Sequence, residues 1–162
     1  MFEKHENPHQ LFSYKLGSTL KMEETVLDML ERQQGAAQSE DLRQQLRHHQ
    51  DETRQQIENL QQAFSSLGEK PDRNTDMVIE AIDKEAMLQV KRSEDSVIDT
   101  VILAGAAETE HHEIAVYDWL ISEAEAMGHS DVVGLLRQNL RQEQHTLEEV
   151  QRATRATAQQ MA

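Results

Sequence analysis

Apolar side chains recur every three or four residues along most of the chain, and short polar segments with glycine or proline interrupt the pattern. A period of about 3.6 residues is typical of amphipathic α-helices. The pattern predicts four long helices, over residues 8–35, 39–67, 93–127 and 130–157, and a weaker helical stretch over 77–90. Because these segments account for most of the chain, we expect an all-α fold.

The predicted helix ends carry residues that start and stop helices. Pro8 suits a first helical turn, Ser39 precedes two acidic residues as an N-cap does, and three helices are followed by glycine: Gly35, Gly68 and Gly128. Two helical hairpins joined by one long connection are typical of a four-helix bundle with a crossover, here carrying a short fifth helix. We expect a single domain over 1–162, with an ordered core at about 8–157.

Carboxylates interrupt the apolar face of every long helix. Those on the core seams are Glu23, Glu52, Glu110, Glu113 and Glu143. Counted from the predicted turns at ~1.5 Å per residue, these positions lie at nearly the same height in the two hairpins. Four or five carboxylates at one depth of a narrow bundle repel one another and lose hydration, so protons or cations must neutralise them.

The negative charge of this cluster favours cations over protons, since a di-metal centre carries +4 or more. Carboxylate oxygens with one imidazole suit iron or manganese. His49 precedes Glu52 by one turn and shares its face, so it is a candidate ligand; the alternative is a core histidine that donates to a carboxylate without metal. Thr53 and Gln56 make the surroundings polar enough for supporting hydrogen bonds. Tyr117, one turn after Glu113, either packs in the core or supports the site by hydrogen bonding.

The composition limits the partners and the chemistry. A net charge of −14 from 16 basic and 30 acidic residues repels nucleic acids and anionic membranes. The absence of Cys excludes disulfides, thiolate metal sites and a Cys nucleophile. No stretch approaches the ~18 apolar residues of a membrane span, and the N-terminus lacks the apolar segment of an export signal, so we expect a cytoplasmic protein.

These residues resemble the ferritin-like superfamily of di-iron carboxylate proteins and, within it, the bacterial YciE/YciF family. The second resemblance is carried by the segments 49–53 (HQDET), 110–117 (EHHEIAVY) and 135–143. The superfamily resemblance implies two irons that react with O2 or peroxide, and the YciE/YciF family is associated with stress responses. Matched by position, the superfamily ligands fall on Glu23, Glu52, Glu110 and Glu143, and Glu113 resembles the additional carboxylate of rubrerythrin-type sites.

The sequence also departs from the superfamily pattern. A Glu-x-x-His motif is expected twice, but Gln55 follows Glu52 and Thr146 follows Glu143 at the third position. His49 is a candidate replacement on one side, and an oxygen-rich site with one histidine is also suited to manganese or another divalent ion.

Two main functions therefore remain open. The first is a di-metal protein that oxidises Fe(II) or reduces O2 or peroxide in stress defence. The second is a non-enzymatic structural or interaction bundle with a degenerate or weakly occupied metal site. An iron-storage cage is a third, weaker reading. A homodimer through exposed apolar residues of the helices at 8–35 and 39–67 would be ordinary for the expected fold.

Overall fold

The computed structural model describes residues 4–161, and within that range it contains helices and no strand. The elements are α1 (Pro8–Ala36), α2 (Glu40–Ser66), α3 (Met77–Arg92), the 3₁₀ turn η1 (Asp95–Val97), α4 (Ile98–Ala126) and α5 (Ser130–Met161). The all-α prediction and the short helix in the crossover are confirmed. None of these helices has a stretch long and apolar enough to pass through a lipid bilayer.

Some predicted helix boundaries need correction. Gly35 does not end the first helix, because α1 continues to Ala36 and has its C-cap at Ala37. The helix expected to start at Ser93 starts at Ile98, because Ser93 ends α3 and η1 makes a separate turn before α4. The last helix continues past residue 157 to Met161. The predicted cap at Ser39 is confirmed, since its hydroxyl accepts from the backbone amide of Leu42 at 3.4 Å. Asn7 caps α1 in the same way, accepting from the amide of Gln10 at 2.9 Å.

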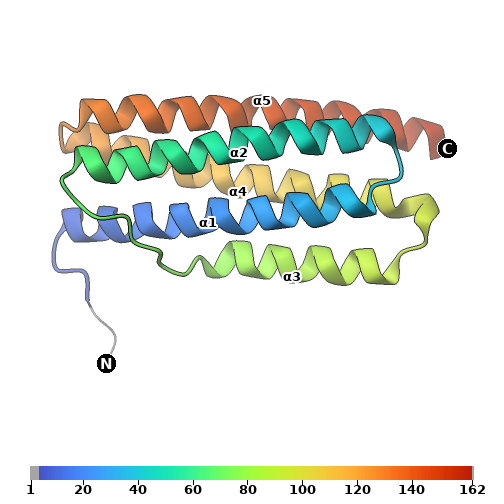
Figure 1. The fold of residues 1–162 in the computed structure, drawn as a ribbon, viewed down its shortest axis with the longest axis horizontal. Coiled ribbons are helices and arrows are strands. Elements are labelled where there is room, and N and C mark those ends of the chain that lie inside the picture. Colours follow the sequence, from blue (N-terminus) through green and yellow to red (C-terminus); the bar gives the residue numbers. More distant parts are fainter. Residues whose placement is uncertain (1–3, 162) are drawn as a thin grey trace.

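Four long helices form the bundle and α3 lies outside it (Figure 1). α1 packs chiefly against α2, and α4 packs against α5, so each predicted hairpin forms one antiparallel pair. α2 and α5 then face each other, as do α1 and α4, which closes the four-helix arrangement. The long connection returns the chain along the bundle, and this gives the expected ferritin-like layout.

The bundle interior has apolar side chains toward both ends and a polar layer at mid-length. One apolar group includes Phe12, Leu16, Phe64 and Leu120, and the other includes Met29, Leu46, Ile102 and Val150. Between them lie four fully buried or nearly buried glutamates: Glu23, Glu110, Glu113 and Glu143. The fold therefore places charged groups where water is excluded from both sides.

The crossover is attached to the bundle at two points before α3 begins. Residues 72–75 lie on α1 at Gly17, where a Cβ atom would come within 2.7 Å of Asn74 Nδ2 and 3.2 Å of the Asp72 carbonyl oxygen. Asp76 then caps α3 by accepting from the amides of Val78 and Ile79 at 3.0 and 3.1 Å, and it pairs with His112 of α4 at 3.2 Å. These contacts hold α3 beside α1 and α4.

Candidate metal centre

Three helices bring four of the predicted ligands together inside the bundle. His49 comes from α2, Glu110 and Glu113 from α4, and Glu143 from α5. One potential ligand atom from each lies within 4.8 Å of the others. His49 Nε2 is 3.6 Å from an oxygen of Glu110 and 3.6 Å from an oxygen of Glu143. The spacing of three between Glu110 and Glu113 puts both on one face of α4, which is why a single helix supplies two ligands.

Most polar atoms of this group have no hydrogen-bond donor in the described structure. Both carboxylate oxygens of Glu110 and of Glu113, one oxygen of Glu143, and Nε2 of His49 are buried without a hydrogen-bond partner. An unpaired buried polar group costs ~1–3 kcal/mol, and a charged one costs more. The hydrogen bonds of this group are thus incomplete, and its unpartnered oxygen and nitrogen atoms are free to coordinate a cation.

Burial and mutual repulsion also raise the pKa values of the carboxyl groups. The pKa values of Glu110 and Glu113 lie well above the ordinary value, first because burial disfavours the charged form and next because Glu143 is close. Glu23 has a raised pKa for the same two reasons, although the hydrogen bond from Tyr117 acts in the opposite direction. In the absence of cations, protons must therefore neutralise part of this cluster.

Glu23 of α1 lies at the edge of the four-residue group. It is fully buried, and its charge is close enough to Glu113 to contribute to the raised pKa of that residue. The Tyr117 hydroxyl donates to Glu23 Oε1, while Glu23 Oε2 has no hydrogen-bond partner. The free oxygen makes Glu23 available as a fifth ligand, and Tyr117 fixes the orientation of its carboxylate.

Glu52 lies outside the four-residue group. Its side chain is 15% exposed, one oxygen is 3.5 Å from His48 Nε2, and the other accepts from Thr146 at 3.5 Å. Glu52 is nevertheless close enough to Glu110 to raise the pKa of that residue. The prediction that Glu52 lies on a core seam thus holds only in part. Its side chain is mostly buried, but its carboxylate is directed toward the surface between α2 and α5.

Hydrogen bonds from neighbouring side chains hold the cluster in place. Gln56 donates from Nε2 to Glu143 Oε1, and the Thr53 hydroxyl donates to the backbone oxygen of His49 at 2.9 Å. Asn139 donates to the Tyr117 hydroxyl at 3.1 Å and accepts from Asn59 at 2.7 Å. The predicted supporting residues therefore contact the site or the backbone of its histidine.

Asn59 and Asn139 were not among the supporting residues predicted from the sequence. In the last helix, Asn139 and Thr146 are buried more completely than the adjacent apolar residues Leu140 and Leu147. From Leu136 onward, the buried positions of α5 are Leu136, Asn139, Glu143, Thr146 and Val150, with steps of 3, 4, 3 and 4. The available signal was that Asn139 and Thr146 continue this period through Glu143 when polar residues are allowed on the seam.

The donor set fits a hard divalent or trivalent ion. It offers several carboxylate oxygens and one imidazole and, in the absence of Cys, no thiolate. Ligand atoms on opposite sides of one ion with ~2.1 Å bonds lie about 4.2 Å apart, so a spread of 4.8 Å requires only a small contraction. The residues present are thus compatible with a bound metal.

Comparisons with known proteins agree with this fold. Residues 7–162 match the family described as Domain of unknown function (DUF892). Protein YciF of Escherichia coli strain K12 is 30% identical over 138 residues, covering 84% of this chain and 83% of that protein.

Solved structures show the same arrangement. The E. coli stress protein YciF superposes with a TM-score of 0.91 at 26% identity, covering 96% of this chain and 99% of the other. YcfI of Rhodopseudomonas palustris, described as a candidate structural protein, superposes with a TM-score of 0.90 at 33% identity, covering 93% and 98%. A protein of Xanthomonas campestris with 20% identity and a TM-score of 0.75, covering 94% of each chain, shares the fold.

Proposed function

The chain belongs to the YciF family, described as DUF892, and from this membership and the buried cluster we propose that it is a metal-binding protein of the ferritin-like class. The observation that carries the proposal is the set of buried carboxylate oxygens without hydrogen-bond donors on Glu110, Glu113 and Glu143. A purely structural core would gain stability by replacing such groups with apolar side chains. Their presence together with His49 supports a role in binding cations.

The ligands in this proposal are His49, Glu110, Glu113 and Glu143, with Glu23 as the adjoining fifth. Four carboxylates at the centre, with Glu52 at its edge, carry up to five negative charges, and two divalent ions supply four positive charges. We therefore propose two ions, iron first and manganese or another divalent metal second.

Iron bound at this site would supply the electrons for reducing O2 or peroxide, which is the chemistry we propose for a role in stress defence. The protein's own contribution follows from its contacts. Tyr117 and Gln56 orient the carboxylates of Glu23 and Glu143. The apolar groups on both sides exclude water, which strengthens the interaction of the carboxylates with a cation.

A structural or interaction protein is the second candidate. Gln55 and Thr146 replace the histidines of the superfamily motif, and Thr146 contacts Glu52 rather than the buried cluster. The description of YcfI as a candidate structural protein also favours this reading. On this alternative the cluster is protonated, or holds a metal only weakly, and has no catalytic role.

A homodimer remains part of the proposal, but its surface needs revision. Among the described residues, the large apolar side chains that are exposed lie mainly on α3, with none on α2: Tyr14, Met77, Val78, Met87 and Leu88. An interface formed by α1 and α2 alone would therefore have little exposed apolar surface to bury.

Metal content tests the proposal directly. The protein would be purified from media supplemented with iron or with manganese, and the metal per chain would be measured by elemental analysis. We expect more than one ion per chain, and a loss of at least half of the metal in the variants Glu110→Gln and Glu113→Gln. The matched control Glu108→Gln, on the exposed side of the same helix, should bind as the parent does.

Well under one ion per chain from both media would contradict the metal-binding proposal and favour the structural alternative. If metal is bound, anaerobic loading with Fe(II) followed by addition of O2 or peroxide distinguishes an oxidase from a metal-stabilised scaffold. Oxidation faster than in a protein-free control supports the enzymatic reading, and an unchanged rate contradicts it.

A further inference from the structure

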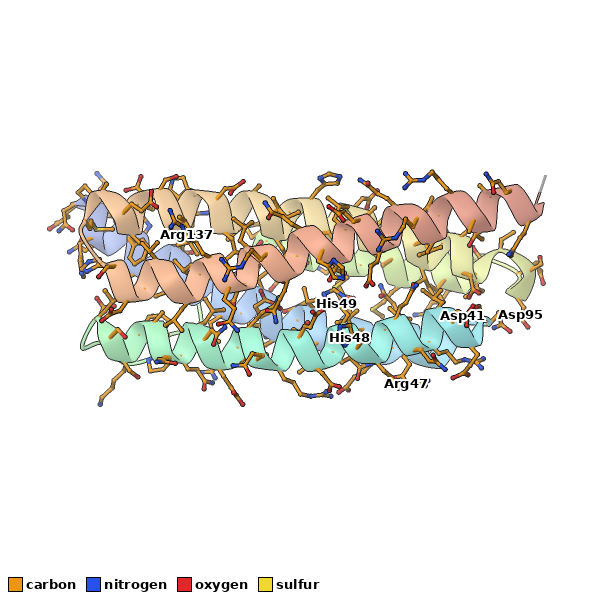
Figure 2. All side chains as sticks on the ribbon, turned by 90° about the horizontal axis from the view of Figure 1, so that it is seen from above. Asp41, Arg47, His48, His49, Asp95 and Arg137 are labelled. Carbon is orange, nitrogen blue, oxygen red and sulfur yellow. The ribbon has the colours of Figure 1, made fainter. Side chains whose placement is uncertain are left out.

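A small cavity leads from the surface to the buried histidine between α2, α4 and α5. Its volume is about 20 Å³. The lining residues at its outer side include His48 and Glu149, whose side chains are 64% and 31% exposed, and His49, 8% exposed, lies at its inner side. Figure 2 shows His49 in the space between α2 and α5, with His48 beside it on α2. The cavity thus connects solvent with one predicted ligand.

Two matched imidazole–carboxylate pairs flank this cavity. His48, Glu52 and Glu149 line it, and His145 contacts Glu149 without lining it. On α2, His48 Nε2 is 3.5 Å from Glu52, and on α5, His145 Nε2 is 3.5 Å from Glu149. Each pair has the i,i+4 spacing that puts both residues on one helix face. The Thr146 hydroxyl of α5 contacts Glu52 of α2 at 3.5 Å, so the two helix faces meet at this point.

The buried end of the cavity also points to a cation. His49 is more than nine-tenths buried, it lines the cavity, and its Nε2 has no hydrogen-bond partner. An unprotonated imidazole nitrogen in this position can accept a metal ion that arrives from the cavity. A second cavity of about 10 Å³ reaches His49 and Glu110 from the α1 side, but the residues around it, such as Met29 and Gln33, are themselves buried.

We propose that His48, Glu52, His145 and Glu149 form an entry site, which captures divalent cations at the surface and passes them through the cavity to His49. The inference rests on the proposed metal centre and assigns it a route of loading. Carboxylates and imidazoles that are partly exposed bind such ions weakly and release them quickly, because water competes for the ion. This role also accounts for Glu52, whose carboxylate lies at the cavity wall rather than in the buried group.

The test separates the rate of metal uptake from the amount of metal bound. Metal-free protein would be mixed with Co(II) alone in a stopped-flow instrument, and the visible absorbance of bound Co(II) would be followed. The double variant His48→Ala/Glu149→Gln should take up Co(II) at least about threefold more slowly than the parent, because local attraction of ions raises their association rate. Its final Co(II) content per chain should equal that of the parent.

Glu148→Gln is the matched control, because Glu148 is the exposed neighbour of Glu149 on α5 and does not line the cavity. Arg152 lies 3.9 Å from Glu148 and 4.0 Å from Glu149, so the two glutamates differ in their place at the cavity and not in this ion pair. It should load at the parental rate. Equal rates in the parent and the double variant would overturn the entry site while leaving the metal centre intact. A lower final Co(II) content in the double variant would also overturn it, since these residues would then hold metal at equilibrium. Failure of the parent to bind Co(II) would contradict the metal centre itself, and the entry site with it.

Discussion

Glu113 is fully buried, and neither of its carboxylate oxygens receives a hydrogen bond. Burial and the nearby Glu143 raise its pKa, so its charged form destabilises the metal-free fold. We expect Glu113→Gln to increase the free energy of unfolding of the metal-free protein at pH 7 by about 1 kcal/mol or more. The measurement is urea denaturation after treatment with a chelator.

The same variant should lose most of the stabilisation that added metal gives the parent. Glu108→Gln on the exposed side of α4 serves as the control and should change neither quantity. Loss of stability in metal-free Glu113→Gln, with metal stabilisation retained, would show that the carboxylate serves the fold and not a cation.

Tyr117 connects the carboxylate of Glu23 with the amide of Asn139 through one hydroxyl. Tyr117→Phe keeps the ring but removes the hydroxyl, so the buried Glu23 carboxylate and the buried Asn139 amide each lose a hydrogen bond. The expected cost is about 1–3 kcal/mol of unfolding free energy, measured by urea denaturation. Tyr14→Phe, at a partly exposed tyrosine of α1, should change stability by less than about 0.5 kcal/mol. Equal effects of the two substitutions would contradict the role of the buried hydroxyl.

At the level of elements, two helical glycines differ in what surrounds them. Nothing lies within 4 Å of a Cβ atom built on Gly134 of α5, whereas one built on Gly17 of α1 meets the crossover at Asp72 and Asn74. Gly134→Ala should stabilise the protein by about 0.5–1 kcal/mol through helix propensity. Gly17→Ala should be less stable than Gly134→Ala by at least about 1 kcal/mol, because the crossover must move. Thermal unfolding of both variants checks this, and equal stabilities would place the crossover away from α1.

The cap of α3 predicts a dependence of stability on pH. Burial disfavours the charged form of Asp76, but the hydrogen bonds from His112 and the amides of Ile79 and Val78 outweigh it and lower the pKa of this carboxyl. A lowered pKa stabilises the fold above the unfolded value of about 3.9, and the contribution is lost as the pH falls through the folded value.

Asp76→Ala should therefore cost about 0.5–2 kcal/mol at pH 7, and the difference from the parent should narrow below about pH 4. Urea denaturation across this range measures it. Asp95→Ala, at the exposed start of η1, is the control and should show a smaller loss. A difference that stays constant from pH 7 to pH 3 would exclude the charge of Asp76 as its cause.

The helices could be predicted from the sequence because their signals are local. The apolar period and the polar breaks between helices indicated their number, and similar distances from the predicted turn correctly indicated that Glu113 and Glu143 meet. The position of Glu52 could not be predicted, since a seam position permits a carboxylate to turn inward or outward. Asn139 was missed because its burial depends on partners, Tyr117 and Asn59, that are distant in sequence.

On the scale of the whole molecule, the net charge of −14 attracts cations before any contact forms. We expect the rate of Co(II) uptake to fall when NaCl is raised from about 20 mM to about 500 mM, because salt screens this attraction. Stopped-flow absorbance measures the rate. The Glu149→Gln variant should keep part of the salt dependence, since most of the excess charge lies elsewhere. An uptake rate that does not change with ionic strength would contradict a contribution from the net charge. Only groups in direct contact with the ion would then attract it.

The polar layer between two apolar groups also restricts how the four helices can align. A helix displaced along its axis by seven residues, ~10.5 Å, would keep leucines against leucines but would bring a glutamate level with an apolar group. Such an arrangement would bury a carboxylate with neither partner carboxylates nor a shared cation beside it. The glutamates thus disfavour competing alignments of the bundle. A chain with leucines at these positions would have several helix alignments of similar energy, whereas the present sequence favours one alignment.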